Sequence, residues 1–275
     1  MDYKKLIIIP VILLVFSIGY LYLKTTTTGL NLDIDLKGGT QISAESANSV
    51  DQADLERILK SYSASVRVAR GITGTYSVLI EFDSSINADD VIQTLKQNNY
   101  NFDSYSTQTI GPTLGAAFFQ QAQVILIFAF IFMAITVFII YRIPVPSFYV
   151  VLAGFADITE ALAFSQILGI PLSLATFASL LLLLGYSVDT NILLTTRVLK
   201  GGESDIKDKI GAAMKTGLTM IGATAAALFA LFFISTSTVI TQIASVLLIG
   251  LIFGILNTWI TNAALLRIYI ERRRK

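Results

Sequence analysis

Three carboxylic acids interrupt the most apolar parts of the chain, and their type and spacing could do chemistry. Asp157 and Glu160 lie three positions apart in GFADITEALAF, so one helix would present both on the same face. Asp189 lies in the next apolar run, LLLLLGYSVDTNILLTTRV. An acid in the core of a bilayer costs about 2.5–3.5 kcal/mol. We therefore expect these three acids to have a functional or structural role that offsets this cost.

A carboxyl group can be kept in hydrocarbon in three ways. It can hold a proton, it can pair with a cation such as Lys215 in the fifth apolar run, or it can face a water-filled crevice. The first and third ways together describe a proton or ion site formed by the three acids. The alternative is a structural hydrogen bond that holds helices together. Thr190 and Asn191, next to Asp189, suit helix contacts or support for that acid.

The composition is that of a membrane protein. Of 275 residues, 54% are hydrophobic and only 14% are charged, against roughly 25% charged in an ordinary soluble domain. The lack of His and Cys in the sequence excludes disulfides, thiolate chemistry and the commonest metal ligand, so we expect no metal and no other cofactor. A net charge of +1 gives no reason to expect a nucleic-acid partner.

Six apolar runs are each close to the ~20 residues that a membrane-spanning helix needs. They are roughly residues 6–23, 118–141, 145–168, 172–195, 210–234 and 239–266. The first run, within residues 1–29, has no small-residue cleavage pattern, so we interpret it as an uncleaved anchor. Residues 116–268 would form a five-helix bundle, and residues 269–275 a basic tail.

The positions of lysine and arginine predict the orientation of these spans. Basic residues lie before the first span, after the second, after the fourth and after the sixth, at Lys4, Lys5, Arg142, Arg197, Lys200, Lys207, Lys209 and in RIYIERRRK. All of these sites lie on one side if both termini are cytoplasmic, and the opposite short links carry no charge. The pattern predicts a multi-pass protein of the cell membrane with both termini in the cytoplasm.

The polar residues 30–115 predict a small folded domain on the outer side. TQISAES, ASVRVAR, TYSVLIEFD and FDSYSTQT have strand patterns, and two amphipathic helices begin at caps Ser49 and Asn87. The order β-α-β-β-α-β is the ferredoxin-like α+β arrangement. Gly38–Gly39 indicates a turn at a strand boundary. The domain has no recognisable catalytic set, so we expect a contact module and not an enzyme.

Three motifs resemble signatures of the SecD/SecF family, whose members are accessory subunits of the Sec protein-export machinery. NLDIDLKGGTQIS follows the first span, TIGPTLGAAFFQQA precedes the second, and GYSVDTNILLTTRV lies in the fourth. The motifs come in the family's order, and the resemblance covers nearly the whole chain. The positions that match the signatures are Asp35, Gly38, Gly39, Gly111, Pro112, Gly115, Gly185 and Arg197.

The resemblance implies both a fold and a role. The size of the outer region favours the SecF type of subunit, and the form of the fourth-span motif is similar to that of archaeal members. The family shares six spans with resistance-nodulation-division exporters and assists protein export by using the proton-motive force. By this resemblance, Asp189 would be the proton-responsive carboxyl and Asp157 a nearby partner, with a proton or sodium gradient as the energy source. A SecD-like subunit, the Sec channel and the translocating polypeptide would be partners.

The sequence departs from the family pattern at three places. Asp189 comes one residue earlier than the acid of bacterial SecF-like chains, which rotates it by about 100° on a helix. Thr196 replaces an acidic residue before Arg197. The arginine of the fifth span in bacterial members has no clear match, and Lys215 is the nearest cation.

Two other functions fit the same features. The chain could be half of a resistance-nodulation-division exporter for lipids or small molecules, although such exporters usually duplicate the six-span set within one chain. It could also be a membrane scaffold in which the buried acids only join helices. Gly250 and Gly254 form a GxxxG pair, which predicts only that another helix approaches closely.

Overall fold

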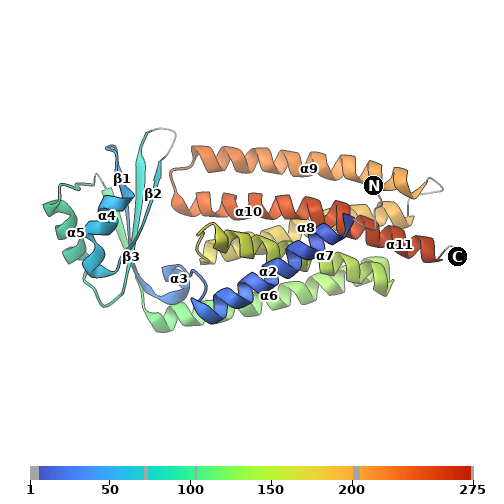
Figure 1. The fold of residues 1–275 in the computed structure, drawn as a ribbon, viewed down its shortest axis with the longest axis horizontal. Coiled ribbons are helices and arrows are strands. Elements are labelled where there is room, and N and C mark those ends of the chain that lie inside the picture. Colours follow the sequence, from blue (N-terminus) through green and yellow to red (C-terminus); the bar gives the residue numbers. More distant parts are fainter. Residues whose placement is uncertain (1–5, 71–73, 103, 201–204, 274–275) are drawn as a thin grey trace.

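The computed structural model describes residues 6–70, 74–102, 104–200 and 205–273. Lys4 and Lys5 of the predicted anchor lie outside this part. A small sheet domain caps one end of a long helical bundle (Figure 1). Within the described residues, six helices are long and apolar enough to cross a membrane, which confirms the predicted number of spans.

The six long helices begin and end close to the predicted positions. They are α2 (Ile8–Thr27), α6 (Pro112–Tyr141), α7 (Pro144–Ile167), α8 (Leu174–Lys200), α9 (Ile206–Ile234) and a last helix made of α10 (Thr238–Leu256), a π-helical segment (Asn257–Asn262) and α11 (Ala263–Arg273). Both α6 and α7 begin with proline, whose fixed φ suits the first helical position. The helix continues to Arg273, so the predicted basic tail from residue 269 is helical up to that point.

The outer domain has the predicted ferredoxin-like order. Its elements are α3 (Ile34–Lys37), β1 (Gly39–Ser46), α4 (Gln52–Ile58), a 3₁₀ turn (Lys60–Tyr62), β2 (Ser65–Arg70), β3 (Tyr76–Phe82), α5 (Ala88–Gln97) and β4 (Ser104–Ile110). The four strands pair antiparallel in the order β2-β3-β1-β4. Helices α4 and α5 cover the face of the sheet away from the bundle (Figure 1). Leu55, Leu95 and Ile80 are fully buried between these layers.

Polar side chains cap the N-termini of the two outer-domain helices. Asn87 caps α5, because its Oδ1 accepts a hydrogen bond from the Asp89 amide at 3.0 Å. The predicted cap Ser49 is wrong, since Asp51 caps α4 by accepting from the Ala53 amide at 3.0 Å. Both residue types are strong caps, and Asp51 directly precedes Gln52, the first helical residue.

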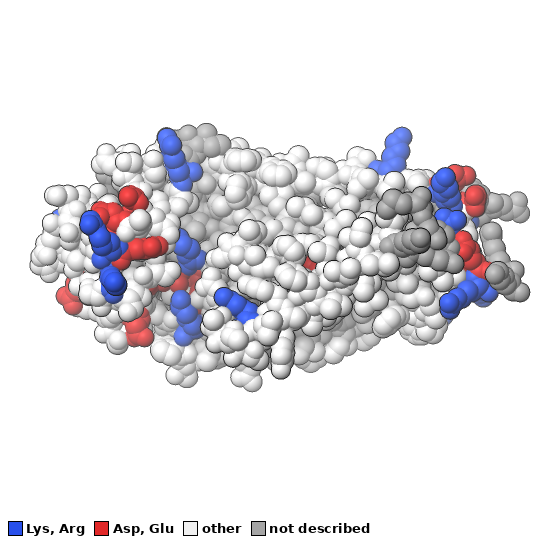
Figure 2. Space-filling model, in the orientation of Figure 1, with Lys and Arg blue, Asp and Glu red and all other residues white. Residues whose placement is uncertain are grey.

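The charged residues separate into two zones at opposite ends of the molecule. Figure 2 shows Lys, Arg, Asp and Glu gathered at both ends, with little charge on the long middle part of the visible face. Exposed apolar side chains such as Phe132, Ile127 and Phe229 cover the outer surfaces of the helices there. This surface matches the hydrocarbon of a bilayer, and the chain is a multi-pass membrane protein.

The segment before β1 fastens the outer domain to the bundle. The Leu172 amide, in the link between α7 and α8, donates to the Asn31 carbonyl at 2.8 Å, and the Asp33 amide donates to the Leu172 carbonyl at 2.9 Å. The Gln166 side chain accepts from the Asn31 amide at 2.7 Å. The chain entering the outer domain is therefore bonded to the end of α7.

A group of charged side chains lies beside this segment. Lys37 Nζ lies 3.1 Å from Glu81 Oε2, and Arg67 pairs with Glu81 and lies 3.6 Å from Asp33 Oδ2. Both acids are almost completely buried. Pairing offsets the cost of burying them. Glu81 has two cationic partners, whereas Asp33 is near Arg67 alone among the ion pairs found in the described residues, so removing Arg67 would leave Asp33 without its cation.

The family glycines permit a close contact between α3 and α6. A Cβ on Gly38 would lie 2.6 Å from Pro112 Cα, and one on Gly115 would lie 2.6 Å from the Gly38 amide nitrogen. Gly38 and Gly39 also have φ values of 81° and 138°, which glycine adopts without strain. Gly111 is the N-cap of α6. The two glycine motifs are thus halves of one packing contact, in addition to the predicted turn.

Asp35, the remaining family residue in this region, is half-buried in a polar cavity between the sheet and the ends of α8 and α10. Burial raises the pKa of the Asp35 carboxyl, and the neighbouring charge of Asp33 adds to the effect.

We predict that Gly115→Ala destabilises the protein by about 1–3 kcal/mol, because the new methyl group has no space at this contact. The control is Gly222→Ala, also inside a long helix, where a Cβ meets nothing within 4 Å; it should be neutral or stabilising. Thermal unfolding in detergent measures both. Equal unfolding temperatures of the two variants would contradict the close contact between α3 and α6 at Gly115.

Candidate intramembrane carboxyl site

Asp157 and Glu160 lie together inside the bundle, joined by a residue from the last helix. Both acids are fully buried. The Asn257 Nδ2 amide donates to Asp157 Oδ1 at 2.8 Å and to Glu160 Oε2 at 2.7 Å. One amide group therefore bridges two carboxyl groups, which must lie close together because both bond the same nitrogen. The predicted shared face of the two acids is the face that packs against the last helix.

Small residues let the neighbouring helices approach these acids. On α7, the buried residues around them include Ala153, Gly154, Ala156 and Ala161. On α10, a Cβ on Gly254 would lie 3.7 Å from Asp157 Oδ2, and a Cβ on Gly250 would overlap the Leu183 side chain. The GxxxG pair thus brings α10 against α7 and α8.

A π-helical segment positions the bridging amide. Residues Asn257–Asn262 depart from α-helical winding in the middle of the last span. Such segments are rare and occur frequently at functional sites. The extra width turns Asn257, Thr258 and Asn262 inward, and all three are at most 1% exposed. Asn262 Nδ2 donates to Asn191 Oδ1 at 2.6 Å, so the segment bonds to α8 as well as to α7.

Asp189 is placed differently from the prediction. The sequence predicts a buried carboxyl, but the structure exposes Asp189 on the surface of α8. It lines a cavity of about 110 Å³ between α8, α9 and α10, and Asp157 lines the same cavity. Such a volume has room for several water molecules. The hollow therefore connects the exposed acid to the edge of the buried pair.

The neighbours of Asp189 on α8 make helix contacts. Thr190 is buried and donates to the Tyr186 carbonyl at 3.0 Å. Asn191 is fully buried, donates to the Ser187 carbonyl at 2.8 Å and accepts from Asn262. The bond between Asn191 and Asn262 joins α8 to the last helix, whereas the Thr190 bond stays within α8.

Lys215 does not pair with the acids. It is exposed on α9, and the ion pairs found among the described residues lie in the outer domain, at its junction with the bundle and in α11. Of the three ways to keep a buried acid, cation pairing is the one that the described residues do not provide for Asp157 and Glu160.

The electrostatics of the pair follow from its composition. Asp157 Oδ2 and Glu160 Oε1 are buried and accept no hydrogen bond within the described part of the chain. Two ionised carboxylates side by side in a low-dielectric interior repel each other strongly. The arrangement therefore suits a pair that holds at least one proton and that responds as a unit.

Two family positions on α8 lie outside this cluster. Gly185 and Arg197 are both exposed, and Arg197 lines an open hollow that also reaches Asp189. Thr196, which replaces the family's acid, shares a 3.0 Å hydrogen bond with the Tyr141 hydroxyl. Tyr141 also donates to the Ile192 carbonyl at 2.8 Å, so α6 and α8 are joined through a neutral contact.

Two residues that complete the site, Asn257 and Asn262, were not predicted from the sequence. The available signal was weak, because two amides in an apolar run are ordinary in a transmembrane helix. Asn257 lies 100 positions from Asp157 in the chain, and Asn262 lies 71 positions from Asn191. No local pattern reports contacts over such distances.

Comparison with known proteins places this chain in a family. The sequence model described as "Protein export membrane protein SecD/SecF, C-terminal" matches residues 90–272. The chain belongs to the SecD/SecF family. It is 39% identical to "Protein-export membrane protein SecF" of Pyrococcus furiosus, over 99% of this chain and 93% of the relative. It is 38% identical to the relative of the same description from Methanocaldococcus jannaschii, over 99% of this chain and 98% of the relative.

A solved structure supports the fold. The crystal structure of SecDF, a translocon-associated membrane protein from Thermus thermophilus, has a TM-score of 0.80 over 98% of this chain. The identity is 17%, and the chain spans 38% of the length of that protein. A second SecDF structure, in a super-membrane-facing form, has a TM-score of 0.59. The predicted family, fold and role as an accessory membrane subunit in Sec protein export are confirmed.

We predict that Asn257→Ala lowers the free energy of unfolding by about 1–3 kcal/mol, because it removes the donor shared by two buried acids. Asn262→Ala removes one bond between two neutral amides, so it should cost only about 0.5–1.5 kcal/mol. Thermal unfolding in detergent compares them. An Asn257→Ala cost below that of Asn262→Ala would show that the amide does not hold the acids.

Proposed function

We propose that this chain acts with a SecD-like subunit to promote protein export through the Sec channel, coupled to a proton or sodium gradient. The proposal places it in the cytoplasmic membrane with both termini inside, without enzymatic activity and without a bound cofactor. The family membership supports the pairing, since the SecDF protein combines both parts in one chain and this chain spans 38% of it. A separate subunit would supply the counterpart.

One observation carries the coupling part of the proposal: a cavity lined by Asp189 and Asp157 reaches the carboxyl pair from the exposed side of α8. Asp189 would exchange ions with the surroundings, and Asp157 with Glu160 would hold the proton. A proton that enters the pair removes one buried charge and changes how α7 packs against the last helix. A membrane potential supplies about 2.3 kcal/mol per charge per 100 mV, enough to shift a balance between two packings.

The route from this site to the outer domain runs along α7. The helix carries both acids and ends at Ile167, beside the link that bonds Asn31 and Asp33 through Leu172. A shift of α7 against its neighbours would therefore move the base of the outer domain. That domain would contact the emerging polypeptide or the partner's outer region.

We predict that Asp157→Asn and Asp189→Asn each reduce export of a Sec-dependent protein by about tenfold or more, with normal amounts of the protein in the membrane. Asparagine keeps hydrogen bonding but cannot ionise, so a scaffold of helix contacts would tolerate it. The measurement is pulse-chase secretion in cells that also contain the SecD-like subunit. Asp208→Asn, an exposed acid outside the cavity, is the matched control and should export normally.

Export at the wild-type rate in both variants would refute gradient coupling through these acids. The gradient is also collapsed in the wild type and in the variants. If the variants still export more slowly than the wild type under that condition, the substitution has impaired assembly instead of ion coupling. The proposal requires that collapsing the gradient slows the wild type to the rate of the variants.

A further inference from the structure

A second groove lies at the end of the bundle remote from the outer domain. It has a volume of about 160 Å³ and is formed where the start of α9, the π-helical segment and α11 meet. Its lining residues are Leu6, Lys207, Ile210, Trp259, Ile260, Ala263, Ala264 and Arg267. The walls are apolar, and both charged residues among the lining residues are cations.

We propose that this groove binds an anionic phospholipid, with its hydrocarbon chain along the apolar wall and its phosphate at Lys207 and Arg267. Ala263 and Ala264 have small side chains, so a hydrocarbon chain in the groove can lie close to α11. Lys207 is exposed at the mouth and supplies a mobile ammonium group. Arg267 Nε donates to Glu271 Oε1 at 2.9 Å, which fixes the guanidinium beside the groove.

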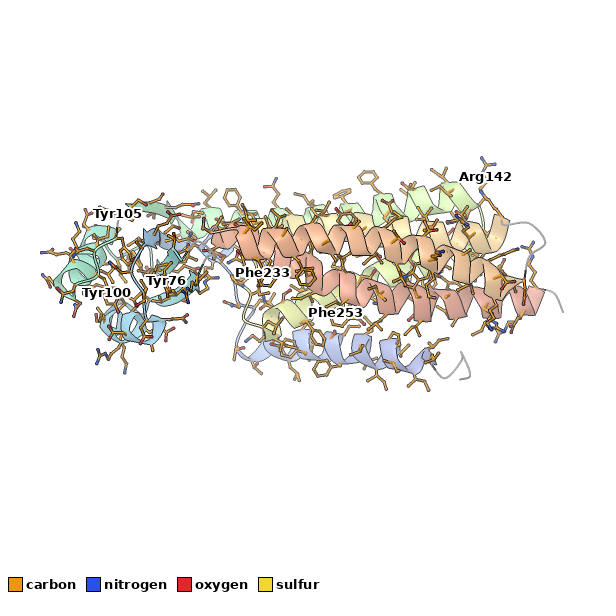
Figure 3. The ribbon with its side chains drawn as sticks, turned by 90° about the horizontal axis from the view of Figure 1, so that it is seen from above. Tyr76, Tyr100, Tyr105, Arg142, Phe233 and Phe253 are labelled. Carbon is orange, nitrogen blue, oxygen red and sulfur yellow. The ribbon has the colours of Figure 1, made fainter. Side chains whose placement is uncertain are left out.

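The charge of the surrounding surface fits the same ligand. At this end the described basic residues are Arg142, Arg197, Lys200, Lys207, Lys209, Arg267, Arg272 and Arg273, against the acids Asp205, Asp208 and Glu271. Figure 3 shows Arg142 at this end, far from Phe233 and the outer domain. Such clusters next to a bilayer attract anionic headgroups, at about 1 kcal/mol per basic residue.

A lipid in this groove would touch the segment that controls the carboxyl pair. Trp259 lies two positions after Asn257 in the π-helical segment. Its ring packs on Gly217 of α9, where a Cβ would come within 2.3 Å of it. The groove and the carboxyl pair thus both contact the six-residue π-helical segment. They contact different residues of it, since Trp259 and Ile260 line the groove and Asn257 bonds to the pair.

The single tryptophan of the chain makes the proposal directly measurable. Because Trp259 is the only Trp, its fluorescence reports on the groove alone. The full-length protein is placed in phosphatidylcholine bilayers that contain increasing fractions of brominated phosphatidylglycerol, or brominated phosphatidylcholine for comparison. Bromine quenches tryptophan only near contact, so preferential quenching by the anionic lipid measures its occupancy of the groove.

We expect the brominated anionic lipid to quench at lower fractions than the brominated zwitterionic lipid. Lys207→Gln should reduce this preference by about fivefold, which corresponds to about 1 kcal/mol, and Lys207→Arg should preserve it. Arg142→Gln is the matched control, because it removes a charge at the same end but outside the groove, and it should preserve the preference.

Three results would overturn the proposal. The two brominated lipids could quench equally, the loss at Arg142→Gln could match that at Lys207→Gln, or added inorganic phosphate could relieve the quenching. The first shows no headgroup selection, the second shows a general surface charge effect, and the third assigns the cations to a free anion.

Discussion

The amide of Asn257 joins two fully buried carboxyl groups, and the packing of the bundle core depends on that bridge. An acid in hydrocarbon needs a proton, a cation or water. The described residues offer Asp157 and Glu160 an amide donor and an adjacent cavity, but no ion pair. The π-helical winding of Asn257–Asn262, the glycines of α10 and the small residues of α7 all serve to bring this amide and these acids together.

The junction of the outer domain joins the sheet directly to the bundle that holds the bridge. The link after α7 bonds the chain that enters the sheet, and glycines at positions 38 and 115 bring α3 and α6 into backbone contact. Paired charges around Glu81 lie at the base of the outer domain, beside this junction.

The sequence predicts the elements of this protein well, because spans and strands leave local signals. Apolar runs of helix length, basic residues at alternate ends and the β-α-β-β-α-β order all come from neighbouring residues. The expected burial of Asp189 was wrong, because an apolar run gives no indication of which helix face the bundle covers. It also missed Asn257, since the contact joins α7 to a segment about a hundred residues later. The cap at Asp51, two positions after the predicted Ser49, shows the same limit at a smaller scale.

Infrared difference spectroscopy would show whether the carboxyl pair holds a proton inside the membrane. The reconstituted protein would be compared in light and heavy water at neutral pH with the Asp157→Asn/Glu160→Gln double variant. We expect a protonated carboxyl band in the wild type that shifts in heavy water and is absent from the double variant. A spectrum in which the wild type and the double variant share every protonated carboxyl band would contradict it, because both acids would then be ionised.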